Sequence, residues 1–356
     1  MYQKKFVKGR SFWGRIVLLT TFFAIAVFLI TGSVYAESSS KVYKWKLEPY
    51  LPEVDPSVSK NVDQLIKMID TNTDGRVKIS KFPANSICPG GEVLNAVATG
   101  VLDMGISIGG YNAGAIPAAA VEDGLPFQWS GLRQMTEILW DYGLEDLMRG
   151  EYTKQGVYLL GLYTAGGTGA QVYTTKPVQS LQELKGKKIR TWGHFLKLVE
   201  KIGASPVSMP LGEVYSALQM GALDGVLIVT AVVESFKFYE VVPYGLLPQF
   251  NWGATHSTFI NPKKWNELPG DLKEIVRLTF HDWRSWNARY YNPRYNYVTV
   301  EDVQKMGIKM TQLPASDVKE IKKAAYEIWD EVAAKNEVTA KAIEIVRKYQ
   351  KEMGEE

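Results

Sequence analysis

Arg190 is the residue of this chain best suited to bind a small charged molecule. It lies in a short segment of alternating character, residues 189–192, that follows a lysine-rich turn around Gly186. This alternation predicts a strand on which Arg190 points away from the side of Ile189. A guanidinium on a rigid strand matches a carboxylate with two parallel hydrogen bonds and is always charged. The alternative is an ordinary surface arginine on a half-exposed strand.

A polar, glycine-rich segment precedes this strand. Residues 161–171 read GLYTAGGTGAQ, a composition typical of a flexible loop. Its place between two predicted lobes favours a role in lining a cleft, and an ordinary surface loop is the alternative.

Two stretches of the chain resemble each other, which predicts two lobes built to one plan. Residues 95–106 read NAVATGVLDMGI, and residues 216–227 read SALQMGALDGVL. In both, a glycine suited to cap a helix precedes two apolar residues, a turn aspartate and a short apolar strand. The strands GRVKIS, from Gly75, and GKKIRT, from Gly186, precede the two stretches and match as well. Two such lobes leave a crevice at the carboxyl ends of their strands, where we expect Arg190.

Strand and helix patterns alternate along the chain, which predicts an α/β fold with parallel strands. The patterns predict strands over residues 42–47, 76–80 and 310–313, the last at a sheet edge, and helices over 61–69, 272–290 and 316–351, the last as one or two helices.

The first 36 residues are typical of a secretory signal. Five basic residues and no acidic ones precede an apolar run over residues 16–30, and Ala36 ends a small-residue cleavage pattern. The run is shorter than the roughly 20 residues of a membrane span, although an uncleaved anchor is the alternative. Without this segment, 36 Lys and Arg stand against 38 Asp and Glu, a formal net charge of −2. The balance does not indicate a nucleic-acid partner.

Other chemical motifs are incomplete. The single cysteine, Cys88, excludes an internal disulfide; it is either a buried small residue or a thiol activated by a helix N-terminus. The segment from Asp70 to Gly75 starts like a calcium loop but has Lys81 where a glutamate is required. The three histidines lack metal-site spacing, and no set of acid, base and nucleophile indicates an enzyme.

The chain resembles the extracytoplasmic solute receptors of TRAP transporters, the DctP-like family, over most of residues 42–315. The motifs that carry the resemblance are GRV from Gly75, GVLDMG over residues 100–105, SL at 180–181 with LKGKKIR over 184–190, EVY at 213–215 with ALQ at 217–219, residues 221–225, and residues 259–265 with LP at 268–269. It implies an α/β, two-lobed periplasmic-binding-protein fold with a ligand cleft between the lobes and long bracing helices.

The resemblance also implies how a ligand is held. The arginine that clamps the ligand corresponds to Arg190, and Thr168 to Gln171 look like the segment that supplies a glutamine in the branch binding 2-oxo acids with a cation. That branch adds a Glu-Trp pair, where this chain has Leu227 and Ile228, and a later acidic ligand is replaced near Trp252. Apolar side chains cannot coordinate a hard cation, so we predict no metal or other cofactor.

The predicted ligand site combines polar and aromatic side chains. Thr168 and Gln171 would add hydrogen bonds to those of Arg190, and Trp192 is either core or pocket wall. Tyr111, Trp129 and Trp252 either line the apolar part of the ligand or pack in the core.

The predicted organisation places a signal peptide at 1–36, lobe 1 at 37–164 with part of 250–295 returning to it, lobe 2 at 165–249, and C-terminal helices packing on the lobes at 296–356. The predicted function is that of a periplasmic receptor that delivers a small organic acid to TRAP membrane permease subunits, as a monomer or homodimer. The alternatives are a receptor of another importer, a ligand-binding sensor component, and an enzyme acting on organic acids.

Overall fold

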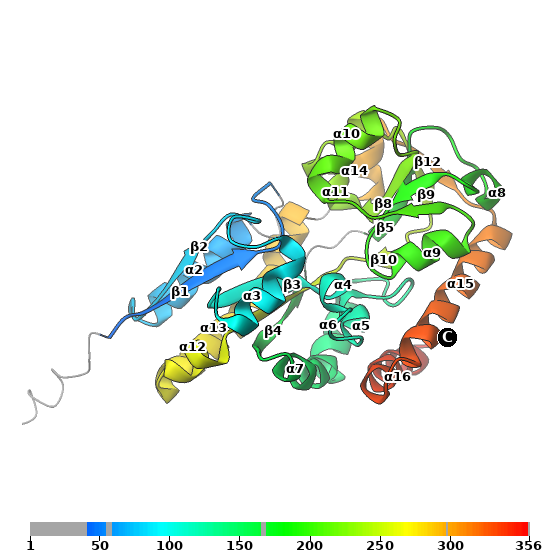
Figure 1. The fold of residues 1–356 in the computed structure, drawn as a ribbon. Coiled ribbons are helices and arrows are strands. Elements are labelled where there is room, and N and C mark those ends of the chain that lie inside the picture. The colour runs from blue at the N-terminus through cyan, green and yellow to red at the C-terminus, as the bar shows by residue number, and fades with distance from the viewer. Residues whose placement is uncertain (1–40, 55–58, 165–168, 297, 355–356) are drawn as a thin grey trace, which may run out of the picture. The chain divides into compact units, whose positions relative to one another are not determined.

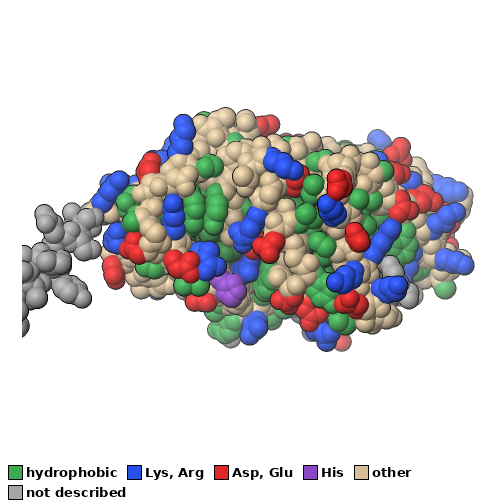
Figure 2. Space-filling view, turned by 90° about the horizontal axis from the view of Figure 1, so that it is seen from below, with side chains coloured by type: hydrophobic (Ala, Val, Ile, Leu, Met, Phe, Trp, Pro, Cys, Tyr) green, Lys and Arg blue, Asp and Glu red, His purple; other side chains and the backbone are tan. Residues whose placement is uncertain are grey.

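The computed structural model describes residues 41–54, 59–164, 169–296 and 298–354. The predicted signal segment, residues 1–36, lies outside the described residues. Residues Tyr43–Glu356 form one compact unit. Among the described residues, no helix has both the length and the apolar character needed to cross a bilayer. Figure 2 shows acidic and basic side chains interspersed over one face, as expected of a chain with 41 Lys and Arg and 38 Asp and Glu.

Sheet A has five strands in the order β2-β1-β3-β11-β4 (Figure 1). They are β1 (Tyr43–Pro49), β2 (Val77–Lys81), β3 (Met104–Ile108), β4 (Tyr158–Thr164) and β11 (Thr255–Ile260). β1 pairs in parallel with β2 and β3, and β11 runs antiparallel to both of its neighbours. β1 alternates buried Tyr43 and Trp45 with exposed lysines, so the strand predicted over 42–47 is confirmed.

Sheet B has seven strands in the order β12-β9-β5-β8-β6-β7, with β10 paired to β5. They are β5 (Gly169–Thr174), β6 (Lys188–Arg190), β7 (Ser205–Val207), β8 (Gly225–Val229), β9 (Tyr244–Leu247), β10 (Asn251–Trp252) and β12 (Lys309–Gln312). The strand predicted around Arg190 is confirmed as β6, which ends at this residue. β12 confirms the predicted edge strand, and part of the C-terminal region therefore belongs to sheet B.

Helices pack on both sheets and enclose three apolar clusters of described residues, the largest of which contains residues of both lobes. Around sheet A lie α2 (Ser59–Asn72), η1 (Gly90–Glu92), α3 (Val93–Thr99), α4 (Gly109–Asn112), α5 (Ala119–Asp123), α6 (Leu132–Thr136), η2 (Glu137–Asp141), α7 (Leu144–Lys154), α12 (Pro262–Glu267), α13 (Gly270–Trp286) and η5 (Asn287–Asn296). Around sheet B lie α8 (Leu181–Leu184), α9 (Phe195–Lys201), η3 (Leu211–Glu213), α10 (Val214–Gln219), α11 (Thr230–Ser235), η4 (Phe238–Glu240) and α14 (Val300–Lys305). Leu65 of α2 and Phe280 of α13 share a core with Trp45, because the apolar residues of each helix recur at helical spacing.

The chain passes between the sheets three times. It leaves sheet A after β4 to enter β5, returns from β10 to β11 through Gly253 and Ala254, and leaves again between η5 and α14. The two sheets are therefore the centres of two lobes that share a boundary, and a few backbone segments connect them.

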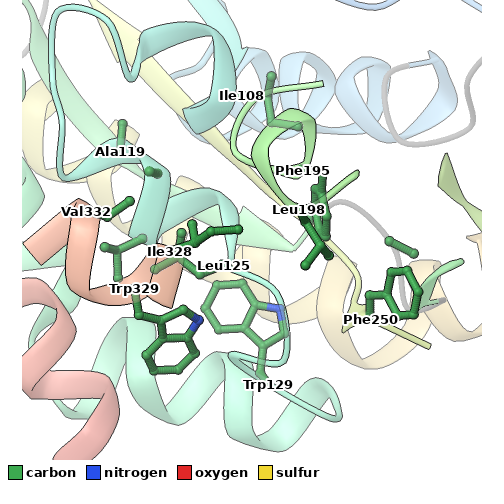
Figure 3. Packing of buried hydrophobic residues seen from close by; sticks show 14 of the residues in the cluster. Ile108, Ala119, Leu125, Trp129, Phe195, Leu198, Phe250, Ile328, Trp329 and Val332 are labelled. Atoms are coloured by element: carbon green, nitrogen blue, oxygen red, sulfur yellow. The ribbon is translucent and has the colours of Figure 1, made fainter. Parts of the chain in front are cut away.

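The helices α15 (Ala315–Ala333) and α16 (Glu337–Glu352) connect elements of both lobes. Lys197 of α9 pairs with Glu331 at 2.5 Å, and Trp329 donates its indole N–H to the carbonyl of Pro126 at 3.0 Å. Figure 3 shows Ile328, Trp329 and Val332 of α15 gathered with Ala119 of α5 and with Phe195 and Leu198 of α9. The region predicted as one or two helices thus forms two, and α15 is packed into the largest core.

The internal repeat holds, but its strands correspond differently from the prediction. β1 lies between the parallel strands β2 and β3, and β6 lies in the same way between β7 and β8. β6 therefore corresponds to β1, and β2 corresponds to β7, so the predicted match of GRVKIS with GKKIRT is wrong. Sequence similarity misled here because a lysine-rich strand after a glycine turn occurs at both places.

Equivalent contacts confirm that the helix, turn and strand of residues 95–106 match those of residues 216–227. Gly100 and Gly221 both have positive φ, at 82° and 72°, and follow α3 and α10. The carboxylate of Asp103 accepts the backbone N–H of Lys46 on β1 at 2.8 Å. Asp224 accepts the N–H of Lys188 on β6 at the same distance, 2.8 Å. Each turn aspartate thus fixes the equivalent strand of its lobe, which lies second from one edge of its sheet.

We expect Asp103→Ala to lower the free energy of unfolding by about 1 to 3 kcal/mol, because the N–H of Lys46 would lose its acceptor. Asp103→Asn retains a side-chain oxygen at this position and should cost less than half as much. Urea denaturation followed by circular dichroism measures both variants. Equal losses for the alanine and asparagine variants would show that the hydrogen bond is not what the aspartate supplies.

Candidate functional site

Arg190 is buried at the end of β6 without an acidic partner. Arg190 as a whole residue is 4% exposed to solvent. Nε and Nη2 both donate to the backbone carbonyl of Met209, at 3.3 and 3.1 Å. Among the described residues, no carboxylate forms an ion pair with it, and Nη1 has no hydrogen-bond partner. Burial lowers the pKa of Arg190, and Tyr111 partly opposes this shift.

The corresponding position in sheet A carries the opposite charge. Because Lys46 corresponds to Lys188, Glu48 of β1 corresponds to Arg190. Glu48 is fully buried, but its carboxylate accepts hydrogen bonds from the N–H groups of Ile87 and Cys88, at 2.9 and 3.4 Å, and from a serine hydroxyl. The loop before α3 therefore satisfies Glu48, whereas the equivalent loop before α10 offers Arg190 one carbonyl.

Tyr111 of lobe 1 interacts electrostatically with Arg190, and Trp192 of lobe 2 follows Arg190 by two residues. Tyr111, on α4, is 41% exposed and packs edge-on against Tyr50 with ring centroids 5.5 Å apart. Trp192 follows β6, is partly buried against two cores, and donates its indole N–H to Asp123 at 3.3 Å. Trp192 therefore has both a core face and a polar contact across the lobe boundary, and its role toward a ligand stays a prediction.

Glycines allow the two lobes to approach closely beside Trp192. A Cβ on Gly110 would lie 2.8 Å from Oδ2 of Asp123 and 3.2 Å from Cδ1 of Trp192. Gly193 has a φ of +51°, which favours glycine, and a Cβ there would lie 3.5 Å from Cα of Gly110. A side chain at Gly110 would collide with Asp123 and press on Trp192, and one at Gly193 would strain the backbone.

Gln171 is buried on β5 in a small polar network. Its Nε2 donates to the hydroxyl of Thr230 at 2.9 Å, and that hydroxyl also lies 2.9 Å from the hydroxyl of Tyr173. The amide oxygen of Gln171 has no partner among the described residues. Thr168, predicted beside it, lies outside the described residues.

Trp129 and Trp252 are neighbours at the point where β10 meets the segment after α5. The backbone N–H of Trp252 donates to the carbonyl of Trp129 at 3.1 Å. Trp129 is 2% exposed and lies in the largest core near Trp329 (Figure 3). Trp252 is partly buried against the same core. In this conformation Trp129 has no face open to solvent.

Several buried polar atoms near the lobe boundary lack partners among the described residues. They are Asp123 Oδ1, Trp129 Nε1, Gln171 Oε1, Thr191 Oγ1 and Asn251 Oδ1. They come from α5, β5, β6 and β10 and the segments that follow these elements. Buried polar groups in proteins are nearly always hydrogen-bonded, so these atoms are available to water or to polar groups of another molecule.

Three of these residues were not predicted. Asp123, Thr191 and Asn251 come from separate parts of the chain, and none belongs to a motif. Only the position of Thr191 directly after Arg190 in the sequence could have marked it as a candidate site residue.

A family model describing bacterial extracellular solute-binding proteins, family 7, named DctP, matches residues 50–336. The chain belongs to this family. The resemblance to DctP-like TRAP receptors is thereby confirmed, and so is the two-lobed α/β fold.

Relatives of this solute-binding protein are associated with organic acids. A monocarboxylate 2-oxoacid-binding periplasmic protein of Nostoc is 26% identical over 299 residues, covering 82% of this chain and 80% of that protein. A TRAP solute-binding protein of Colwellia psychrerythraea, solved with bound calcium and pyruvate, is 24% identical with a TM-score of 0.79, covering 88% of this chain and 95% of that one. Another, from Sulfitobacter with bound β-D-galacturonate, is 21% identical with a TM-score of 0.74, covering 86% and 99%.

The two positions at which the resemblance implies cation ligands hold apolar side chains in this family member. Leu227 and Ile228 are buried on β8, and neither side chain has an oxygen or nitrogen. Within the described part of the chain, no group of three or more His, Cys, Asp or Glu side chains is arranged to hold a metal. A hard cation needs oxygen ligands, which these positions do not supply.

Two adjacent acids of this solute-binding protein are buried beside the site. Burial raises the pKa of Glu122 to about 8 and that of Asp123 to about 7. The Tyr152 hydroxyl lies 3.1 and 3.0 Å from the two carboxyl oxygens of Glu122. The folded protein therefore retains protons on these groups that the unfolded chain releases at a lower pH.

We expect the free energy of unfolding to fall as the pH rises from 6.5 to 8, because Glu122 ionises at about 8 when folded and near 4.5 when unfolded. Burial lowers the pKa of His194 and His256 to about 4 and 3. These histidines make the free energy of unfolding rise with pH, but only up to pH 6.5, the ordinary pKa that they have in the unfolded chain. Glu122→Gln should flatten the fall in urea denaturation at each pH. Glu267→Gln, at an exposed glutamate, is the control. A slope unchanged in the Glu122 variant would mean that Glu122 is already ionised at neutral pH.

Proposed function

We propose that this protein is a periplasmic receptor for a small organic acid, whose carboxylate binds Arg190 between the two lobes. The observation that carries the proposal is the buried guanidinium of Arg190, which has no acidic partner among the described residues. Loss of water around a charged group costs several kcal/mol unless an opposite charge with good geometry replaces it. A ligand carboxylate supplies that charge.

A second buried arginine differs from Arg190 because it has an acidic partner. Arg284 is also largely buried, but its Nη1 lies 2.5 Å from a carboxylate oxygen of Glu145. It also lies over the ring of Trp140, 4.5 Å from the ring centroid. The fold thus pairs Arg284 with a carboxylate of its own, and Arg190 is the one we assign to a ligand.

Other groups at the boundary would complete the hydrogen bonds of the acid. Gln171 and Thr191 each have a buried polar oxygen without a partner among the described residues, and the hydroxyl of Thr191 can donate. Thr168, Trp192, Tyr111, Trp129 and Trp252 remain candidate wall residues. The relatives' ligands support an acid, because the names of those proteins include 2-oxoacids, pyruvate and galacturonate.

The two apolar residues on β8 indicate which kind of organic acid would bind. Leu227 and Ile228 do not provide cation ligands, so the acid would be bound without a bridging metal. We propose a ligand with a larger apolar part, or one that lacks a chelating group next to its carboxylate.

Binding would work through the segments that connect the lobes. A ligand that contacts both lobes stabilises the closed conformation by the difference between its affinities for the closed and open forms. The closed receptor would then deliver the acid to the membrane permease subunits of a TRAP transporter. The protein would act in the periplasm as a receptor, not as an enzyme, and as a monomer or homodimer.

We expect Arg190→Gln to reduce the affinity for the acid by about 100-fold or more, because charged hydrogen bonds contribute roughly 1.5 to 3 kcal/mol each. Isothermal titration calorimetry against a panel of organic acids measures this loss. Arg133→Gln is the matched control, since the side chain of Arg133 is 74% exposed. Unchanged affinity in a folded Arg190 variant would exclude Arg190 as the anchor.

A further inference from the structure

Asp123 is a buried acid at the lobe boundary with one oxygen unsatisfied. The residue is 2% exposed, at the end of α5. Its Oδ2 accepts the indole N–H of Trp192 at 3.3 Å, whereas Oδ1 is buried without a hydrogen-bond partner among the described residues. No Lys, Arg or His of the described chain forms an ion pair with it. The carboxyl group therefore has hydrogen-bonding capacity that the described protein does not use.

Asp123 and Arg190 lie around the same two residues of α4. Gly110 contacts Asp123 so closely that a Cβ there would be 2.8 Å from Oδ2. The next residue, Tyr111, is close enough to Arg190 to affect its pKa. Trp192, two residues after Arg190, makes the contact with Asp123 from the other lobe. Asp123 and Arg190 are thus both buried, are linked through Trp192 and residues 110–111, and form no salt bridge with each other.

The separation of these two groups is maintained by the fold. Arg190 is held by the carbonyl of Met209 in its own lobe, and Asp123 is held by Trp192 and lies against Gly110. A guanidinium and a carboxyl group that are held apart match a molecule with two complementary groups. A molecule with a carboxylate alone would satisfy Arg190 and leave Oδ1 of Asp123 unpaired, which is unfavourable in a buried site.

We infer that Asp123 is a specificity-determining residue that accepts a hydrogen bond from a hydroxyl or ammonium group of the ligand whose carboxylate binds Arg190. The inference rests on the proposed function and narrows its ligand class to acids that carry a second, hydrogen-donating group. Trp192 occupies Oδ2 and leaves Oδ1 for the ligand. A hydroxy acid and an amino acid offer the same donor chemistry, and the experiment distinguishes them.

The test uses matched acids that differ only in this second group. Calorimetry compares propanoate, lactate and alanine, and also hexanoate, 2-hydroxyhexanoate and norleucine, because Leu227 and Ile228 favour a larger apolar part. We expect Asp123→Asn to weaken binding of the hydroxy or amino acid that the wild-type protein prefers by about tenfold to 100-fold. Binding of the matching unsubstituted acid should change little. An amino acid should lose more than a hydroxy acid, because asparagine cannot offer an ammonium group the negative charge of an ionised aspartate.

A structural role for Asp123 predicts a different pattern. Trp192→Phe removes the contact between Trp192 and Asp123 but keeps the carboxyl group. If Asp123 only positions Trp192, both variants should weaken all acids alike, and this result would overturn the inference. Equal unfolding midpoints of wild-type and variant proteins confirm that the comparison is made on folded protein.

An experiment can distinguish failure of this inference from failure of the proposed function. Small molecules released from purified wild-type protein are identified by mass spectrometry and added to the panel. A bound acid that has no hydroxyl or ammonium group, and depends on Arg190, would overturn the role of Asp123 and leave the proposed function standing. A bound molecule without any acid group, or failure of every acid to bind, would overturn both.

Discussion

The burial of one guanidinium without a counter-charge is the constraint on which this site depends. Arg190 is held at the end of β6 by a backbone carbonyl, and it loses most of its hydration there. A carbonyl accepts hydrogen bonds but does not neutralise a charge, so the site favours an anion from outside the chain. Its rigid position on a strand keeps the hydrogen-bonding direction fixed before a ligand arrives, which reduces the entropy cost of binding.

The two lobes carry opposite charges at equivalent positions, with different hydrogen-bond partners. Glu48 and Arg190 occupy equivalent positions on β1 and β6, each facing a loop that leads into a short helix. Glu48 is satisfied by two loop N–H groups and a hydroxyl, so in lobe 1 the position stabilises the fold. Arg190 receives one carbonyl from its loop, so in lobe 2 the same position retains capacity for a ligand. The difference lies in how completely each loop satisfies the charge.

The contact between the lobes is equally specific. Gly110 and Gly193 allow α4 to meet the segment after β6, and Trp192 joins Asp123 across this boundary. On another side, α15 packs against α9 through ion pairs and a shared core. The boundary thus combines apolar packing that stabilises the lobes with polar groups that the described protein does not satisfy. Packing residues and the residues proposed to bind a ligand thus lie next to each other, and Trp192 belongs to both groups.

Sequence patterns alone determined the fold class, the repeat of helix, turn and strand, and the candidacy of Arg190, because these depend on local periodicity and turn chemistry. The local amino-acid sequence could not establish which strands of the two lobes correspond, because GRVKIS and GKKIRT look alike and yet differ in sheet position. It also gave no reason to select Asp123 or Asn251, or to distinguish Trp129 in the core from Tyr111 at the surface. Those assignments depend on which distant segments meet at the lobe boundary and on which polar atoms lose water there. Only tertiary packing decides this, because burial and hydrogen-bond partners are properties of the assembled chain.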